Sequence, residues 1–326
     1  MSTGGSLPAK AGDPGGSNRG RSPRTRREAR DAYWLLLPTL IVMAGVIGYP
    51  LLRSFLFAFQ ETKLGDLGGL WSLPSELTLV NFERVLRQPV WSALGTTTVY
   101  AVLVATGSVV VGIVVALALR KPFPGRGLIR AGVLVPYVLP VIAATTIWRA
   151  LLNSQYGFVN VIGVEFLGWE RPLSFLTTRS VEVGGVQVPL ALSVVILFEI
   201  WHTFPLAFLF LTARLQAIDP SLEEAARLDG ASPTQVIRHV LLPELRGVIA
   251  LLVILRLIWT FHNFTSVYLL TGGAGGTEIL PIRIFNEFVV RSDIGAASAL
   301  GMLFTLLLSV LLVAYVIVNR RENADG

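Results

Sequence analysis

Long apolar runs recur along the chain and alternate with shorter polar connections. Six of them reach or exceed the roughly 20 residues that a helix needs to cross a ~30 Å hydrocarbon core. They are residues 33–59, 91–119, 131–152, 188–211, 248–270 and 294–318. This pattern predicts an all-α integral membrane protein with six transmembrane helices, which form one transmembrane domain over residues 31–320.

The composition agrees with a membrane location, and the charge distribution sets an orientation. Hydrophobic residues make up 53% of the 326 residues and charged residues only 15%, below the roughly 25% charged that soluble domains carry. Residues 1–30 carry seven Lys and Arg, residues 120–130 four, residues 214–246 four, and the C-terminal tail two, whereas the other three connections carry three, two and two. Because basic residues favour the cytoplasmic side, both termini are expected there, in a multi-pass protein of the cell membrane.

The two termini are expected to be simple extensions of the membrane domain. Residues 1–30 are rich in Gly, Ser, Pro and Arg, which predicts a disordered basic cytoplasmic tail. The tail is not expected to be a cleavable signal peptide, since the apolar run that follows it is long enough to remain in the bilayer. Residues 321–326 are expected to form a second, short cytoplasmic tail.

Several kinds of chemistry are excluded by the residues present. There are no cysteines, and the three histidines are far apart with no H-E-x-x-H pattern, so no metal site is expected. None of the three lysines follows a glycine, although a P-loop requires Gly-Lys followed by Ser or Thr to hold phosphates. The chain therefore has no recognisable ATP site of its own.

One connection, residues 214–246, contains strong helix start and stop signals. Asp219 followed by Pro220 is typical of a helix start, and Gly230 of a helix end with a left-handed turn. Ser232, with Gln235 three residues later, predicts a second start with a capping box. We therefore expect a short helix, a tight turn and a second short helix.

The second helix is expected to end near Leu242, because Pro243 follows it. Residues 214–246 hold four Arg and five Asp or Glu, so a nucleic-acid-binding role is disfavoured, since phosphate contacts need a basic surface. An amphipathic helix lying on the bilayer stays open as an alternative, although such helices are usually basic. The mixed charges favour a docking element for a soluble cytoplasmic partner.

A family resemblance is specific at this connection. Glu224-Ala225-Ala226, then three residues, Gly230, nine residues and Val240-Leu-Leu-Pro243 resemble the signature loop of ABC importer membrane subunits, E-A-A-x3-G-x9-I-x-L-P, with Val in place of Ile. Other segments are similar to permeases of the carbohydrate-uptake branch of that family. These segments are YPLLRSFLFAFQ, NFERVL, LVPYVLP, IWRALLNSQYGFVN and LLTGGAGGTE.

The resemblance implies a type I importer core and a set of partners. Two permease subunits, usually different chains, pair over two cytoplasmic ATPase subunits, which bind ATP and Mg²⁺, and an extracytoplasmic binding protein delivers the solute. The chain itself would be no enzyme and would bind no cofactor. Its hairpin would be the coupling helix in a cleft of the ATPase, through Glu224, Ala225, Ala226, Asp229, Gly230 and Pro243.

Polar residues inside the apolar runs are candidates for the transport path, because such residues are costly unless a cavity or a partner receives them. Glu199 is the only acidic residue in any predicted span, and Thr203 lies on the same helical face. By resemblance, these faces of carbohydrate permeases line the path. The candidates are Tyr137, Glu199, Thr203, Trp259, Thr260 and Asn263. Alternatively, Glu199 forms an ion pair with His202, Arg149 or Arg256, and the tryptophan lies in an interfacial belt.

The sequence thus favours the permease subunit of an ATP-driven importer for a sugar or related glycoside, such as a disaccharide or a glycerol-phosphate ester. A proton-coupled secondary transporter that uses Glu199 is the alternative, and a membrane-anchored structural or signalling subunit is a third possibility. The predicted coupling hairpin favours the first, because a secondary transporter has no use for it.

Overall fold

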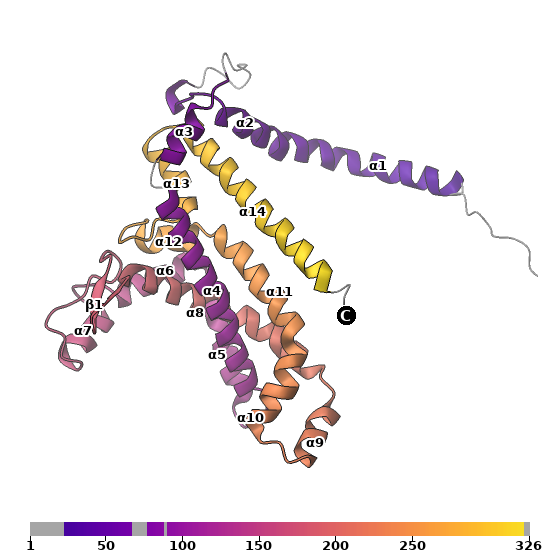
Figure 1. Ribbon diagram of the computed structural model, residues 1–326, viewed down its shortest axis with the longest axis vertical. Coiled ribbons are helices and arrows are strands. Elements are labelled where there is room, and N and C mark those ends of the chain that lie inside the picture. The colour runs from indigo at the N-terminus through magenta and orange to yellow at the C-terminus, as the bar shows by residue number, and fades with distance from the viewer. Residues whose placement is uncertain (1–22, 67–76, 88–89, 323–326) are drawn as a thin grey trace, which may run out of the picture. The chain divides into compact units, whose positions relative to one another are not determined.

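The computed structural model describes residues 23–66, 77–87 and 90–322 (Figure 1). The chain divides into two compact units, Met1–Ser54 and Phe55–Gly326. Each unit is described by itself.

The first unit is helical over its described part. Helix α1 (Pro23–Met43) continues through a π-helical turn, η1 (Ala44–Gly48), into α2 (Tyr49–Ala58), whose last residues, 55–58, belong to the second unit. Because α1 begins at Pro23, the last eight residues of the predicted disordered tail are helical. The reason is local: proline suits the first turn of a helix, and the Arg, Glu and Ala residues after it are good helix formers. Residues 1–22 of that tail lie outside the described residues.

The second unit is built around α4 (Val90–Ala118), α8 (Leu190–Gln216) and α11 (Leu242–Phe261), which pack on one another (Figure 1). A buried cluster of aliphatic side chains and one phenylalanine fills the space between them. Gly112 of α4 allows the close approach to α8, because a Cβ atom there would lie 2.7 Å from the Cβ of Ala207.

The predicted span 131–152 is sharply bent in the structure. It forms α5 (Arg126–Val138) and α6 (Val141–Leu151), whose axes differ by 98°. Leu139 adopts an extended conformation with ψ 133°, as expected of a residue that precedes a proline, here Pro140. The apolar pattern alone did not indicate this bend, which the structure places at Leu139-Pro140.

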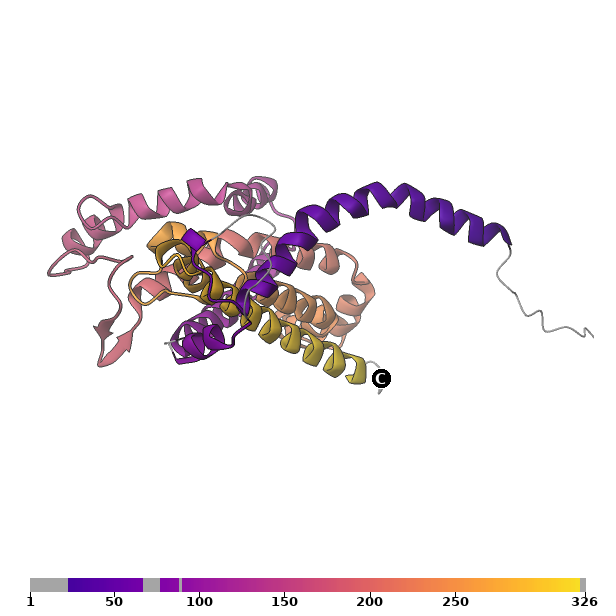
Figure 2. The same cartoon turned by 90° about the horizontal axis from the view of Figure 1, so that it is seen from above.

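Beyond α6 the chain leaves the helical bundle. It forms α7 (Phe158–Glu165) and then the antiparallel strands β1 (Val181–Val183) and β2 (Val186–Val188), with Val181 opposite Val188. Figure 2 shows this segment running out to one side of the bundle. The all-α prediction missed this hairpin, although alternating valines around Gly184-Gly185 are a hairpin signal.

The predicted span 248–270 is also interrupted. Helix α11 ends at Phe261, and α12 (Thr265–Thr271) follows after a short break. Apart from the connection between α8 and α11, the remaining described elements are short pieces and one long C-terminal helix. They are η2 (Leu64–Asp66), α3 (Val80–Arg87), α13 (Leu280–Phe285), η4 (Asn286–Val290) and α14 (Ile294–Glu322).

Three helices of the described chain are long and apolar enough to cross a membrane: Tyr33–Ala58, Val90–Ala118 and Leu190–Gln216. The bent pair α5–α6 makes a fourth if it is one broken span. The other two predicted spans correspond to α11 and α14. Helix α11 is less uniformly apolar because it carries Glu244, Arg246 and Arg256. The helical architecture is confirmed, while the count of six spans stays a prediction.

Candidate functional site

The first candidate site is the charged hairpin, defined as residues 217–241, which joins α8 to α11. Its first helix, α9 (Pro220–Leu228), begins as predicted at Asp219, whose Oδ1 accepts a hydrogen bond from the Ser221 amide at 2.9 Å. This bond favours the ionised carboxylate and lowers the pKa of Asp219 from its ordinary value of 3.8. The cap fixes where the hairpin leaves α8.

The turn after α9 is a complete Schellman motif. Gly230 has φ +84°, its N–H donates to the Arg227 carbonyl at 3.1 Å, and the Ala231 N–H donates to the Ala226 carbonyl at 2.9 Å. A Cβ atom added at Gly230 would meet nothing within 4 Å. Glycine is therefore required here by backbone conformation alone, as the sequence predicted.

The second helix starts with the predicted capping box. The Gln235 N–H donates to Ser232 Oγ at 3.4 Å, and the Ser232 N–H donates to Gln235 Oε1 at 2.7 Å. These bonds open α10 (Pro233–Val236) directly after the glycine turn. The two arms of the hairpin thus meet at a rigid corner.

The second helix is not broken at Pro243, which corrects the prediction. Helix α10 passes through a π-helical turn, η3 (Ile237–Leu241), into α11, and Pro243 lies in the first turn of α11. A proline in a regular helix lacks an N–H donor and clashes with the carbonyl four residues earlier. The wider π turn immediately before Pro243 changes that local geometry. The second arm of the hairpin is therefore continuous with a helix of the bundle.

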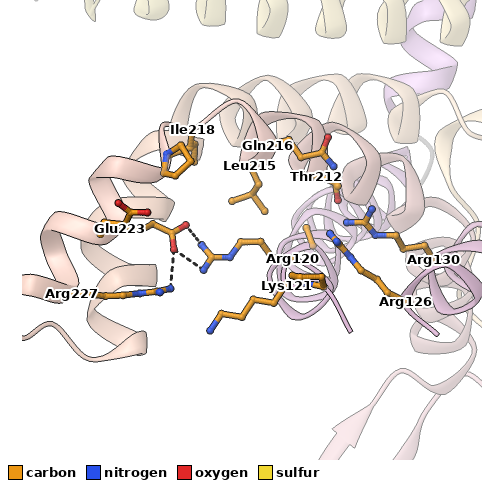
Figure 3. A pocket seen from close by; sticks show the side chains of 14 residues that line it. Arg120, Lys121, Arg126, Arg130, Thr212, Leu215, Gln216, Ile218, Glu223 and Arg227 are labelled. Carbon is orange, nitrogen blue, oxygen red and sulfur yellow. Dashed lines mark hydrogen bonds and ion pairs between the residues drawn. The ribbon is translucent and has the colours of Figure 1, made fainter. Parts of the chain in front are cut away.

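Ion pairs hold the hairpin against the bundle. Glu223 of α9 pairs with Arg120, at the end of α4, through both carboxylate oxygens; the Arg120 Nη2 to Glu223 Oε2 distance is 2.9 Å (Figure 3). Arg227 also reaches Glu223 Oε2 at 3.3 Å. Next to the hairpin, Arg214 of α8 pairs with Glu244 of α11 at 2.8 Å, which joins the two bundle helices that the hairpin connects. The first arm of the hairpin is thereby tied to the bundle, and the second is continuous with α11.

The residues proposed for coupling fall into an exposed and a packed group. Glu224, Ala225, Asp229 and Gly230 are exposed, whereas Ala226 packs against the buried aliphatic cluster and Pro243 is half-buried. Sequence reasoning missed Leu228, whose surface is 89% exposed. The sequence did contain a signal for it: Leu228 lies four residues after Glu224, so the two side chains share one face of the helix.

The second candidate site is a buried polar cluster between α8 and α11. Glu199 is only 4% exposed, and its Oε1 lies 3.6 Å from Arg256 Nη2. Arg256 also donates to Thr203 Oγ1 at 2.8 Å. Of the three alternative partners that the sequence offered for Glu199, the structure therefore places Arg256 beside it.

The other path candidates differ in their contacts and in their burial. Asn263 donates to Tyr100 of α4 at 3.1 Å, a contact that the sequence did not indicate because Tyr100 is 163 positions away. Thr260 is buried, and its hydroxyl has no partner in the described part of the chain. Tyr137 and Trp259 have 42% and 48% of their surfaces exposed.

Apolar helices of membrane-spanning length, a buried ion pair between α8 and α11 and a rigid charged hairpin define a multi-pass α-helical membrane protein. Residues 108–323 match the family described as "Binding-protein-dependent transport system inner membrane component", and the chain belongs to this family. It is therefore an inner-membrane permease component of an ABC-type import system.

Relatives are similar over nearly their whole length. The "Inner membrane ABC transporter permease protein YcjO" of Escherichia coli is 35% identical over 90% of this chain and 95% of its own. The "Trehalose/maltose transport system permease protein MalF" of Thermococcus litoralis is 31% identical over 90% of this chain and 95% of its own. The "Diacetylchitobiose uptake system permease protein DasB" of Streptomyces coelicolor is 30% identical over 97% of this chain and 94% of its own.

A solved structure shares the fold. One chain of a bacterial ABC transporter "involved in the import of the acidic polysaccharide alginate" superposes with a TM-score of 0.72 at 19% identity, over 91% of this chain and 98% of that one. The predicted type I importer fold is confirmed by this likeness and by the family match.

Proposed function

We propose that this chain is one of two permease subunits of an ATP-driven importer for a sugar or related glycoside. Two of the relatives are named for trehalose/maltose and diacetylchitobiose, and the structural neighbour for alginate, so saccharide chemistry is common to these three. Under this proposal a binding protein delivers the solute from outside. ATP and Mg²⁺ bind to two partner ATPase subunits, and this chain contributes neither catalysis nor a cofactor.

The charged hairpin carries the coupling part of the proposal. Its rigid capped corner presents Glu224, Ala225 and Asp229 to solvent, beside the exposed Leu228. Arg227 is exposed on the same helix, so this surface carries both charge signs and one apolar side chain, which suits a folded protein partner better than a lipid surface or a nucleic acid. We place the ATPase against this surface, on the cytoplasmic side together with both termini, as the distribution of Lys and Arg favours.

For the solute we propose a path along the exposed rings of Tyr137 and Trp259 and the amide of Asn263. Aromatic faces and amide groups suit the alternating apolar and hydroxyl surfaces of a sugar. Glu199, Thr203 and Thr260 are buried and would form the supporting layer behind that surface. A relative movement of α8 and α11 would be needed before solute could reach them.

Gly230→Val tests the coupling hairpin. Valine at φ +84° is strained by roughly 1 to 2 kcal/mol, which should misdirect α10 and abolish co-purification with the ATPase or solute-stimulated ATP hydrolysis. Gly185→Val is the matched control, because Gly185 also has φ +84° with open space around it but lies in the β1–β2 turn. Normal ATPase association and stimulation in Gly230→Val would show that the hairpin is not the coupling element.

Glu224→Lys tests the partner surface without bending the backbone. A reversed charge should weaken ATPase binding at least several-fold in reconstituted vesicles, whereas Glu182→Lys, an exposed change on β1, should leave it intact. If the two substitutions affect ATPase binding equally, Glu224 is not part of the interface with the ATPase.

The geometry disfavours proton-coupled transport through Glu199. A proton carrier must exchange protons with water, but Glu199 is buried and its charge is balanced by Arg256. Uptake into vesicles should therefore require ATP and the ATPase, and it should survive collapse of the proton gradient. Uptake that needs the gradient and no ATP would favour the secondary transporter instead.

A further inference from the structure

A cleft of about 440 Å³ lies where the end of α4, the start of α5, the end of α8 and helix α9 meet (Figure 3). Five cationic side chains line it, against two carboxylates, Glu223 and Glu224. The cations are Arg120, Lys121, Arg126, Arg130 and Arg227. The lining therefore carries a net positive charge.

Only part of this charge is balanced within the chain. Glu223 forms ion pairs with both Arg120 and Arg227. Arg126 and Arg130, in contrast, share one neutral acceptor, the Leu119 carbonyl, at 2.7 and 3.1 Å. Two guanidinium groups are thus held together without a carboxylate in the part of the chain that the structure describes, which is unfavourable unless an anion joins them.

Two polar atoms in the same lining lack partners. Arg130 Nε and Thr212 Oγ1 are both buried and make no hydrogen bond within the described residues. Figure 3 shows Thr212 and Gln216 of α8 on the side of the cleft where Arg126 and Arg130 lie. A group that offers several acceptor oxygens and a negative charge would satisfy the guanidinium N–H and the hydroxyl together.

We infer that this cleft binds the phosphate of an anionic phospholipid headgroup. The cleft lies at the ends of three apolar helices, α4, α5 and α8, where headgroups border the hydrocarbon core. Basic clefts between transmembrane helices on the cytoplasmic side attract such headgroups, and this placement rests on the orientation in the proposed function. A bound phosphate joins α5 to α8 beside the Arg120–Glu223 pair, so it also stiffens the base of the hairpin.

The test is retention of lipid by the assembled transporter. The complex is purified in mild detergent from membranes that contain phosphatidylglycerol, and bound lipid is counted by native mass spectrometry. Lys121→Gln removes a charge that makes no hydrogen bond or ion pair with other described residues, and Arg126→Gln removes one of the clustered guanidinium groups. We expect roughly five-fold weaker retention for each charge removed.

Arg238→Gln is the control, because Arg238 is an exposed arginine of the same hairpin outside the cleft. It should retain phosphatidylglycerol as the wild type does. Equal retention in all three variants, equal losses in all three, or no bound phosphatidylglycerol on the wild-type complex would each overturn the inference.

A second experiment identifies the source of the phosphate. The complex in phosphatidylcholine nanodiscs is given either phosphatidylglycerol or millimolar inorganic phosphate, and protection of residues 120–130 from hydrogen exchange is followed. Protection by the lipid alone supports the inference. Equal protection by inorganic phosphate would assign the cleft to a soluble anion and overturn the lipid source. Neither experiment measures solute uptake, so a negative result for lipid binding leaves the proposed transport function standing.

Discussion

Glu199 and Arg256 form a buried ion pair, and the loss of either partner leaves an uncompensated charge. Glu199→Gln should destabilise the purified protein by about 3 to 5 kcal/mol, because breaking a buried pair costs more than replacing it. The double variant Glu199→Gln/Arg256→Met removes both charges and should recover part of that loss. Thermal unfolding in detergent measures both effects.

Additive destabilisation in the double variant would contradict the pairing. A solute-path role has a different signature: the apparent KM for the solute would change in Glu199→Gln at temperatures where the protein stays folded. If transport kinetics are unchanged there, Glu199 is a structural residue and the path lies elsewhere.

Asp219 gives the hairpin a pH dependence of known sign. Its pKa in the folded state is lowered from the ordinary value of 3.8, so its contribution to the cap is complete at neutral pH and is lost as the pH falls through that lowered pKa. Hydrogen exchange at residues 221–223, corrected for the intrinsic rate, should therefore accelerate as the pH is lowered below 3.8. Asp219→Asn keeps an accepting oxygen but cannot ionise, so its exchange should show no such step. The same step in both proteins would assign it to another group.

The sequence predicted contacts between residues that are close along the chain and missed contacts between residues that are far apart. The caps at Asp219 and Ser232 and the turn at Gly230 were predictable, because each depends on partners within five positions. The pairing of Glu223 with Arg120 spans 103 positions. It depends on how α4 and α9 meet, which no local pattern encodes.

The Glu223–Arg120 pair joins helix α9 to the end of α4. Glu223→Gln should leave membrane insertion intact and loosen α9, because a charge-assisted bidentate contact at a partly exposed site is worth about 1 kcal/mol. Increased proteolysis of the hairpin and reduced stimulation of the ATPase are the expected readouts.

The charge reversal Arg120→Glu/Glu223→Arg provides the control. It restores the pair with opposite polarity and should bring protease resistance back towards the wild-type level. If the reversed pair is as sensitive as Glu223→Gln, the contact does not hold α9.

Two prolines show why element boundaries were harder to predict than element types. Pro140 follows Leu139, whose extended backbone gives the 98° bend between α5 and α6. Pro243 follows a π-helical turn, and the helix continues through it. The sequence pattern predicted a break at Pro243 and none at Pro140. The outcome depends on the geometry of the preceding turn, which packing against the rest of the bundle determines.

For the second unit as a whole, the contact between α4 and α8 is a point of close helix packing. Gly112→Ala places a Cβ atom 2.7 Å from the Cβ of Ala207 and 3.0 Å from the Phe208 amide nitrogen. The helices must separate, at a cost of about 1 to 3 kcal/mol. We expect a lower unfolding temperature and a lower yield of the assembled complex.

Gly95→Ala is the matched control, since Gly95 lies on the same helix with open space around it. It should unfold at or above the wild-type temperature, because alanine favours helix over glycine. Equal destabilisation by the two substitutions would mean that α4 and α8 do not approach each other as closely as the structure places them.

The uninterrupted run from Pro233 through η3 to Phe261 has a mechanical consequence. At 1.5 Å per residue such a helix is roughly 40 Å long, and a tilt of about 10° about one end would displace the other by about 7 Å. A broken helix would absorb a push at its base as bending at the break. A continuous one acts as a lever, so a small displacement of the glycine corner reaches the far end, next to Asn263, as a movement comparable to the width of a sugar ring.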